Sequence, residues 1–263
     1  MHRPILAALV AAALMPLPAR AVTDAELGAA RALHVAGEYA AALEVLIPAA
    51  EAGDPAAQAL VGISYAEGLG VDPDPEAARD WLERAAAADE TRALGALGRM
   101  LAMGLGGPED LSRATQLLNE GLRRGDARAA LGLGDLHLDG NGVPQDIARA
   151  RALYGMAARL GLAQGWNSLG DLHRLGIGGP VDPQSAAALY SVAHRAGLAR
   201  ASASLGELAA EGVLPDLGPI EALAYCLHAA RADAARYAAG CESLRAGMDP
   251  EMVSLATDLA DGM

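Results

Sequence analysis

The two cysteines of this chain, Cys226 and Cys241, are the residues whose type and spacing most directly suggest chemistry. A turn between two helical segments is expected near Asp233 and Ala234, and each cysteine lies about seven residues from that turn. Antiparallel helices would bring the two cysteines level, so we expect a disulfide. The alternative is a pair of buried thiols. A redox centre is disfavoured because the chain has no Cys-x-x-Cys spacing.

Aspartate and histidine recur two residues apart, in Asp135-x-His137 and Asp171-x-His173. These residue types occur in metal sites. Residues i and i+2 do not share a helix face, however. Equivalent positions of neighbouring helices lie about 10 Å apart, which is too far for one ion. We therefore expect no metal site, and we expect the two histidines to occupy half-buried positions.

A row of carboxylates forms the candidate binding surface. Asp135, Asp171 and Glu207 hold the same position in successive predicted helices, and further acids follow one turn later. An acidic stripe would favour a partner with basic segments, and the alternative is ordinary solvated surface charge. The residues predicted to contact a partner are Asp135, Asp139, Asp171, Glu207, Glu211, Trp166 and Asn167.

A glycine repeat defines the elements that carry these residues. Its members, spaced 36 residues apart, are Gly62, Gly98, Gly134, Gly170 and Gly206. A fixed period of this length indicates an array of copies of one supersecondary unit. We expect each of these glycines to mark a close approach of two helices.

Each copy has the sequence features of a helical hairpin. A second glycine, six residues after the first, suits the left-handed cap that ends a helix. An aspartate then provides an N-cap for the next helix. These aspartates are Asp74, Asp110, Asp146 and Asp182. The sequence therefore predicts an all-α fold with five stacked hairpins over 55–235, a shortened variant or capping repeat over 22–54, and C-terminal capping helices over 236–263.

The composition limits the classes of function. The 263 residues carry a formal charge of −13, contain no lysine, and are 52% hydrophobic with only 3% aromatic residues. A strongly acidic chain disfavours nucleic acids and anionic membrane surfaces. The glycine-rich loops connect helices and contain no lysine for phosphate. We therefore expect no cofactor and no nucleic-acid partner.

The N-terminus has the features of a secretory signal peptide over 1–21. A short basic start precedes an apolar run from Ile5 to Met15, and Ala19-Arg20-Ala21 fits the small-x-small cleavage rule. The alternative, an uncleaved anchor, is disfavoured because the run is shorter than the roughly 20 residues of a membrane span. Cleavage after Ala21 would place the mature chain in the periplasm or outside the cell, without stable membrane insertion.

The repeat resembles the Sel-one-like repeat, a relative of the tetratricopeptide repeat. The clearest copy runs over 57–86 and includes Gly62, Tyr65, Gly68, Asp74 and Trp81. The resemblance extends over about 55–235 and implies a right-handed α-solenoid whose concave face is built mainly by the first helices. It also implies a protein-binding or peptide-binding adaptor, of the kind found in envelope signalling and assembly, with no shared catalytic residues.

Three functions remain in competition. The leading hypothesis is a non-enzymatic scaffold in the cell envelope that binds a protein or peptide. The second is an envelope hydrolase acting on cell-wall material, which would need a nucleophile or a carboxylate pair converging in a cleft. The third is a structural factor that self-associates along its repeats.

Overall fold

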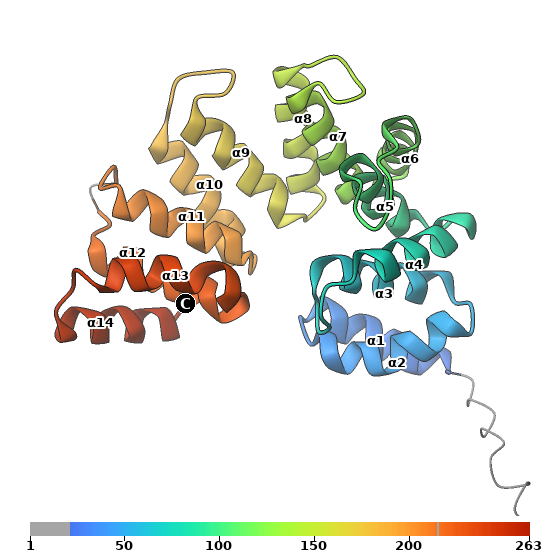
Figure 1. Ribbon diagram of the computed structural model, residues 1–263, viewed down its shortest axis with the longest axis horizontal. Coiled ribbons are helices and arrows are strands. Elements are labelled where there is room, and N and C mark those ends of the chain that lie inside the picture. Colours follow the sequence, from blue (N-terminus) through green and yellow to red (C-terminus); the bar gives the residue numbers. More distant parts are fainter. Residues whose placement is uncertain (1–21, 215) are drawn as a thin grey trace, which may run out of the picture. The chain divides into compact units, whose positions relative to one another are not determined.

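The computed structural model describes residues 22–214 and 216–263. The predicted signal peptide over 1–21 lies outside the described residues. Within them the structure is entirely helical, as the sequence predicts, and α1 to α12 pair into successive hairpins (Figure 1). The first helices of the hairpins are α1 (Asp24–Val35), α3 (Pro55–Glu67), α5 (Thr91–Met103), α7 (Ala127–Asp139), α9 (Ala163–Leu175) and α11 (Ala199–Ala210). The second helices are α2 (Tyr39–Glu51), α4 (Pro75–Ala87), α6 (Leu111–Arg123), α8 (Ile147–Arg159), α10 (Pro183–Arg195) and α12 (Pro219–Ala232). Two further helices follow, α13 (Ala234–Arg245) and α14 (Pro250–Asp261).

The predicted caps set the ends of these helices. Gly140 and Gly176 end α7 and α9 with φ of 75° and 65°, a left-handed conformation that glycine adopts without strain. Asp146 and Asp182 start α8 and α10, and their carboxylates accept hydrogen bonds from the backbone N–H groups of Arg149 and Ser185. The turn before α13 consists of Asp233 alone, so α13 begins at Ala234, two residues before the Arg236 start that the sequence suggested.

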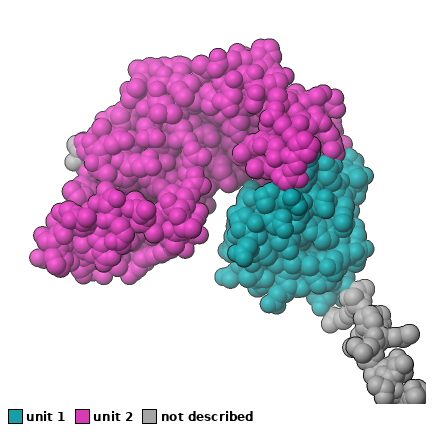
Figure 2. All heavy atoms as spheres, viewed as in Figure 1, with its two compact units in different colours: residues 1–90 teal, residues 91–263 magenta. Residues whose placement is uncertain are grey.

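The chain divides into two compact units, coloured separately in Figure 2. The first ends at Glu90 and contains α1 to α4, with α1 and α2 forming the hairpin of the predicted variant repeat. The second starts at Thr91 and contains α5 to α14. In this second unit each hairpin packs against the next, and α12 packs against both α13 and α14. Along the described chain, no helix combines the length and apolarity needed to cross a bilayer.

Small residues allow the paired helices to pack closely. The fully buried side chains are mostly alanine and leucine, with two tyrosines, Tyr154 and Tyr190. A Cβ added to Gly62 would lie 2.7 Å from Cγ of Leu82, and one added to Gly98 would lie 2.7 Å from Cγ of Leu118. The repeat glycines therefore stand where the first helix meets the second, as predicted.

Candidate functional site

The residue twenty positions after each repeat glycine faces that glycine across the hairpin. It is leucine in the first two copies, tyrosine in the next two and Cys226 in the last. A Cβ on Gly134 would lie 2.5 Å from Cε1 of Tyr154, and one on Gly170 would lie 2.5 Å from Cε1 of Tyr190. Each tyrosine ring thus packs directly against its glycine, and the hydroxyl reaches the residue that follows the glycine in the sequence.

The residue that follows the repeat glycine is an aspartate in both hairpins, Asp135 and Asp171. The Tyr154 hydroxyl donates to Oδ1 of Asp135 at 2.9 Å, and the Tyr190 hydroxyl donates to Oδ1 of Asp171 at 2.7 Å. Burial, followed by the neighbouring carboxylate, raises the pKa of both phenols above the ordinary value, so both stay protonated donors. Burial also raises the pKa of the Asp135 carboxyl, against the opposing effect of Arg99.

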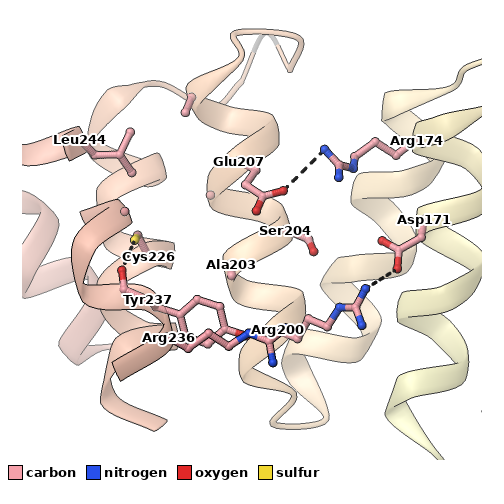
Figure 3. A pocket seen from close by; sticks show the side chains of 13 residues that line it. Asp171, Arg174, Arg200, Ala203, Ser204, Glu207, Cys226, Arg236, Tyr237 and Leu244 are labelled. Atoms are coloured by element: carbon pink, nitrogen blue, oxygen red, sulfur yellow. Dashed lines mark hydrogen bonds and ion pairs between the residues drawn. The ribbon is translucent and has the colours of Figure 1, made fainter. Parts of the chain in front are cut away.

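Arginines from neighbouring hairpins pair with the same row of acids. Nε of Arg99 lies 3.7 Å from Oδ2 of Asp135, which links α5 to α7. Nη2 of Arg200 on α11 lies 3.0 Å from Oδ2 of Asp171 on α9. In return, Nη1 of Arg174 on α9 lies 3.5 Å from Oε2 of Glu207 on α11 (Figure 3). The helices α9 and α11 therefore exchange two ion pairs in opposite directions.

An open pocket of about 550 Å³ lies beside this exchange. Its floor is α11, where Ala203, Ser204 and Ala210 leave space because their side chains are small. One wall is α9 and the other is α13 (Figure 3). The residues that line it are Asp171, Arg174, Arg200, Ala203, Ser204, Gly206, Glu207, Ala210, Cys226, Arg236, Tyr237, Gly240 and Leu244.

A disulfide fixes the α13 wall. Cys226 and Cys241 are bonded, with their Cα atoms 5.5 Å apart, so the structure contains the predicted covalent link between α12 and α13. On α13 the guanidinium of Arg236 lies 5.5 Å from the ring centroid of Tyr237. Within the described residues this guanidinium has no carboxylate partner, unlike those of Arg174 and Arg200.

The predicted partner-binding residues do not form one solvated stripe. Asp139, Glu207 and Glu211 are exposed, and Glu211 lies 3.6 Å from Arg174. Asp135 and Asp171 are only partly exposed and are bonded to tyrosine and arginine. Neither acid is therefore a free surface charge, because each accepts a hydrogen bond from a tyrosine and pairs with an arginine.

Two further predicted residues lie at the start of α9. Trp166 is partly buried and packs against the apolar cluster that contains Tyr190. Asn167 is 2% exposed, and its Nδ2 donates to Oδ2 of Asp171 at 3.1 Å. Asn167 therefore supports the carboxylate from within the fold and does not offer a surface contact.

The aspartate–histidine pairs do not converge on one point. Nδ1 of His137 lies 3.2 Å from the carbonyl oxygen of Pro144, and Nε2 of His173 lies 3.1 Å from Nη1 of Arg151. Both histidines are partly buried. Over 22–214 and 216–263, no group of three histidine, cysteine or acidic side chains is arranged to hold a metal ion.

Sequence reasoning missed both the tyrosines and the arginines. The tyrosines could have been found by following the glycine period to the position twenty residues on, where Leu82 gives way to Tyr154 and Tyr190. Arg200 and Arg236 lie 36 residues apart and so share one repeat position, which Arg92 and Arg128 also hold, whereas Arg174 holds a different one. Only the packing of α9, α11 and α13 brings them to one pocket.

Comparison with known proteins identifies the repeat. The sequence model of the family described as Sel1 repeat matches residues 55–90, 91–126, 127–162 and 167–198, more than half of the chain. The α11–α12 hairpin lies beyond the matched residues. A comparison with curated proteins gave no match.

Solved structures show the same fold. A Sel1 repeat protein from Oxalobacter formigenes is 28% identical with a TM-score of 0.57, and the match covers 90% of this chain and 99% of that one. The protein c5321, a protective antigen of uropathogenic Escherichia coli strains with an SLR fold, is 24% identical with a TM-score of 0.53, over 89% of this chain and 52% of that one. The immunity protein Pa5087 from Pseudomonas aeruginosa is 20% identical with a TM-score of 0.52, over 98% and 88%. The last two similarities concern the fold alone. Together the comparisons confirm the predicted α-solenoid of helical repeats.

Proposed function

Because this chain belongs to the Sel1 repeat family, whose helical scaffolds commonly mediate contacts between proteins, we propose that it binds a segment of another protein in the pocket formed by α9, α11 and α13. The proposal describes a non-enzymatic adaptor. The helices provide the scaffold, and the residues that differ between copies determine which partner is bound.

The observation that carries this proposal is the pocket itself. Its volume of about 550 Å³ is within the range of sites that hold small ligands or side chains. Its floor is made of small residues, and its rim carries charged groups that can bind a backbone or a side chain. The disulfide between Cys226 and Cys241 holds one wall in place, so less order must be gained when a ligand binds.

We also propose that the protein works in the cell envelope. The apolar run and the cleavage pattern before Val22 support export. The bonded pair of cysteines fits an oxidising compartment.

The binding proposal is tested with a library of random soluble peptides. The library is passed over the immobilised protein, and the retained peptides are sequenced by mass spectrometry. Ala203→Trp places a large ring on the pocket floor and should abolish retention. Ala188→Trp, at an exposed position of α10, is the matched control and should retain the same peptides. Failure to retain any peptide, or retention that survives Ala203→Trp, would contradict the proposal.

A further inference from the structure

The pocket has little capacity left to accept hydrogen bonds. Both oxygens of Asp171 are already bonded, Oδ1 by Tyr190 and Oδ2 by Asn167 and Arg200. The other carboxylate in the lining, Glu207, pairs with Arg174. The acids of the pocket are therefore engaged within the fold.

Its capacity to donate hydrogen bonds is much larger. A guanidinium has five N–H donors in a planar fork, and three arginines line the pocket. Nε of Arg174 is buried and has no hydrogen-bond partner. Arg236 has no carboxylate partner among the described residues, and the ring of Tyr237 lies 5.5 Å from its guanidinium.

From this imbalance we infer that the bound segment presents a carboxylate to the pocket, and that Arg236 is its main contact. The inference rests on the proposed binding function and names the chemistry of the ligand. Arg236 can hold a carboxylate through two parallel hydrogen bonds. The Tyr237 ring orients the guanidinium in advance. The carboxylate comes from an acidic side chain or from the C-terminus of the segment.

This inference reverses the charge expected from the sequence. The net charge of −13 and the row of acids favour a basic partner. The ion pairs across α9 and α11 cancel that charge locally, and Arg236 adds one unpaired cation. Because the rest of the chain repels acidic partners at long range, the attraction is confined to the pocket.

The test uses the peptide retained most strongly from the random soluble library. It is synthesised again with its acidic residues changed to their amides, with an amidated C-terminus, and with both changes. We expect at least one change to weaken binding about tenfold or more, as the loss of a charge-assisted hydrogen bond predicts. Comparison of the two single changes identifies the source of the carboxylate.

The variant Arg236→Gln should weaken the unmodified peptide by the same factor and leave the neutralised peptide unaffected. Arg195→Gln, at an exposed position of α10, removes the same charge outside the pocket and is the control. Equal effects of the two variants, or retained peptides without acidic groups, would overturn the inference while leaving pocket binding intact. Retention that Ala203→Trp does not abolish, or no retention at all, would instead overturn the proposed function and the inference with it.

Discussion

The hydroxyl of Tyr190 donates a 2.7 Å hydrogen bond to Oδ1 of Asp171. The contact joins the second helix of a hairpin to the first, at the position where Gly170 lets the tyrosine ring cross. Since Oδ2 of the same carboxylate binds Arg200, one aspartate ties its own hairpin together and also ties it to the next. Asp171 is therefore a structural node at the edge of the pocket formed by α9, α11 and α13.

The first prediction concerns this node. Tyr190→Phe leaves a partly buried carboxylate without its phenolic donor and should destabilise the second unit by about 1.5–3 kcal/mol, the usual value for a hydrogen bond to a charged group. Urea unfolding can be followed by Trp166 fluorescence in a Trp81→Phe background. Tyr237→Phe removes a hydroxyl that has no partner among the described residues and is the control. Equal stability of the two variants would show that the hydrogen bond contributes nothing.

The second prediction concerns close packing at the repeat glycine. Gly170→Ala would place a Cβ 2.5 Å from the Tyr190 ring, so α9 and α10 must separate, at a cost of about 1–3 kcal/mol. Gly155→Ala on α8 is the control. A Cβ there meets only the end of Arg159 at 3.4 Å, so better helix propensity should stabilise the protein by about 0.5–1 kcal/mol. Opposite signs in denaturant unfolding are expected, and a neutral Gly170→Ala would contradict the packing argument.

The third prediction concerns the disulfide. The bond closes a loop with a sequence separation of 15, for which loop entropy predicts a stabilisation of about 3 kcal/mol. Reduction should lower the unfolding midpoint of the second unit. It should also weaken peptide binding, because Arg236 and Tyr237 lie on the helix that the bond holds. A Cys226→Ala/Cys241→Ala variant should start at the lower midpoint and not respond to reductant. A wild-type midpoint that ignores reductant would rule out this role.

The fourth prediction concerns pH. Burial raises the pKa of the Asp135 carboxyl above its ordinary value of 3.8. Hydrogen bonds from Ser185 lower the pKa of Asp182 below that value. Titration of the carboxyl carbons by NMR should therefore give midpoints on opposite sides of 3.8, and midpoints in the reverse order would contradict the assignment.

The same shifts give opposite effects on stability. Because the pKa of Asp135 is raised in the folded state, the folded protein keeps this proton to a higher pH than the unfolded chain does. The resulting contribution to stability is fully present below the unfolded pKa of about 3.8 and is lost as pH rises through the folded pKa. The contribution of Asp182 is present above its unfolded pKa and is lost as pH falls through its lower folded pKa. Asp135→Asn should remove the first dependence and leave the second.

Much of the fold could be predicted from the sequence because it depends on local signals that recur. The glycine period predicts the hairpins, and aspartates such as Asp146 and Asp182 mark the starts of their second helices. The disulfide was also predictable, because two helices around a single-residue turn fix the level of Cys226 and Cys241.

The candidate site was less predictable because it depends on contacts between copies. Asp171 and Glu207 are recognisable as a row, but the arginines that neutralise them come from different positions in different repeats. Arg236 continues the repeat position of Arg200, but it lies on α13, beyond the five glycine copies. The row of acids was therefore predictable from the sequence, whereas its pairing with arginines was not.

The exchange of ion pairs between α9 and α11 restricts how such an array can be rearranged by duplication. The contacts between each repeat glycine and the second helix of its own hairpin are generic. The polar contacts are not, since a copy of 91–126 inserted after α10 would set Arg99 in the place of Glu207, opposite Arg174. The order of the repeats along the chain therefore matters, because the charges that face one another between neighbouring hairpins differ from copy to copy.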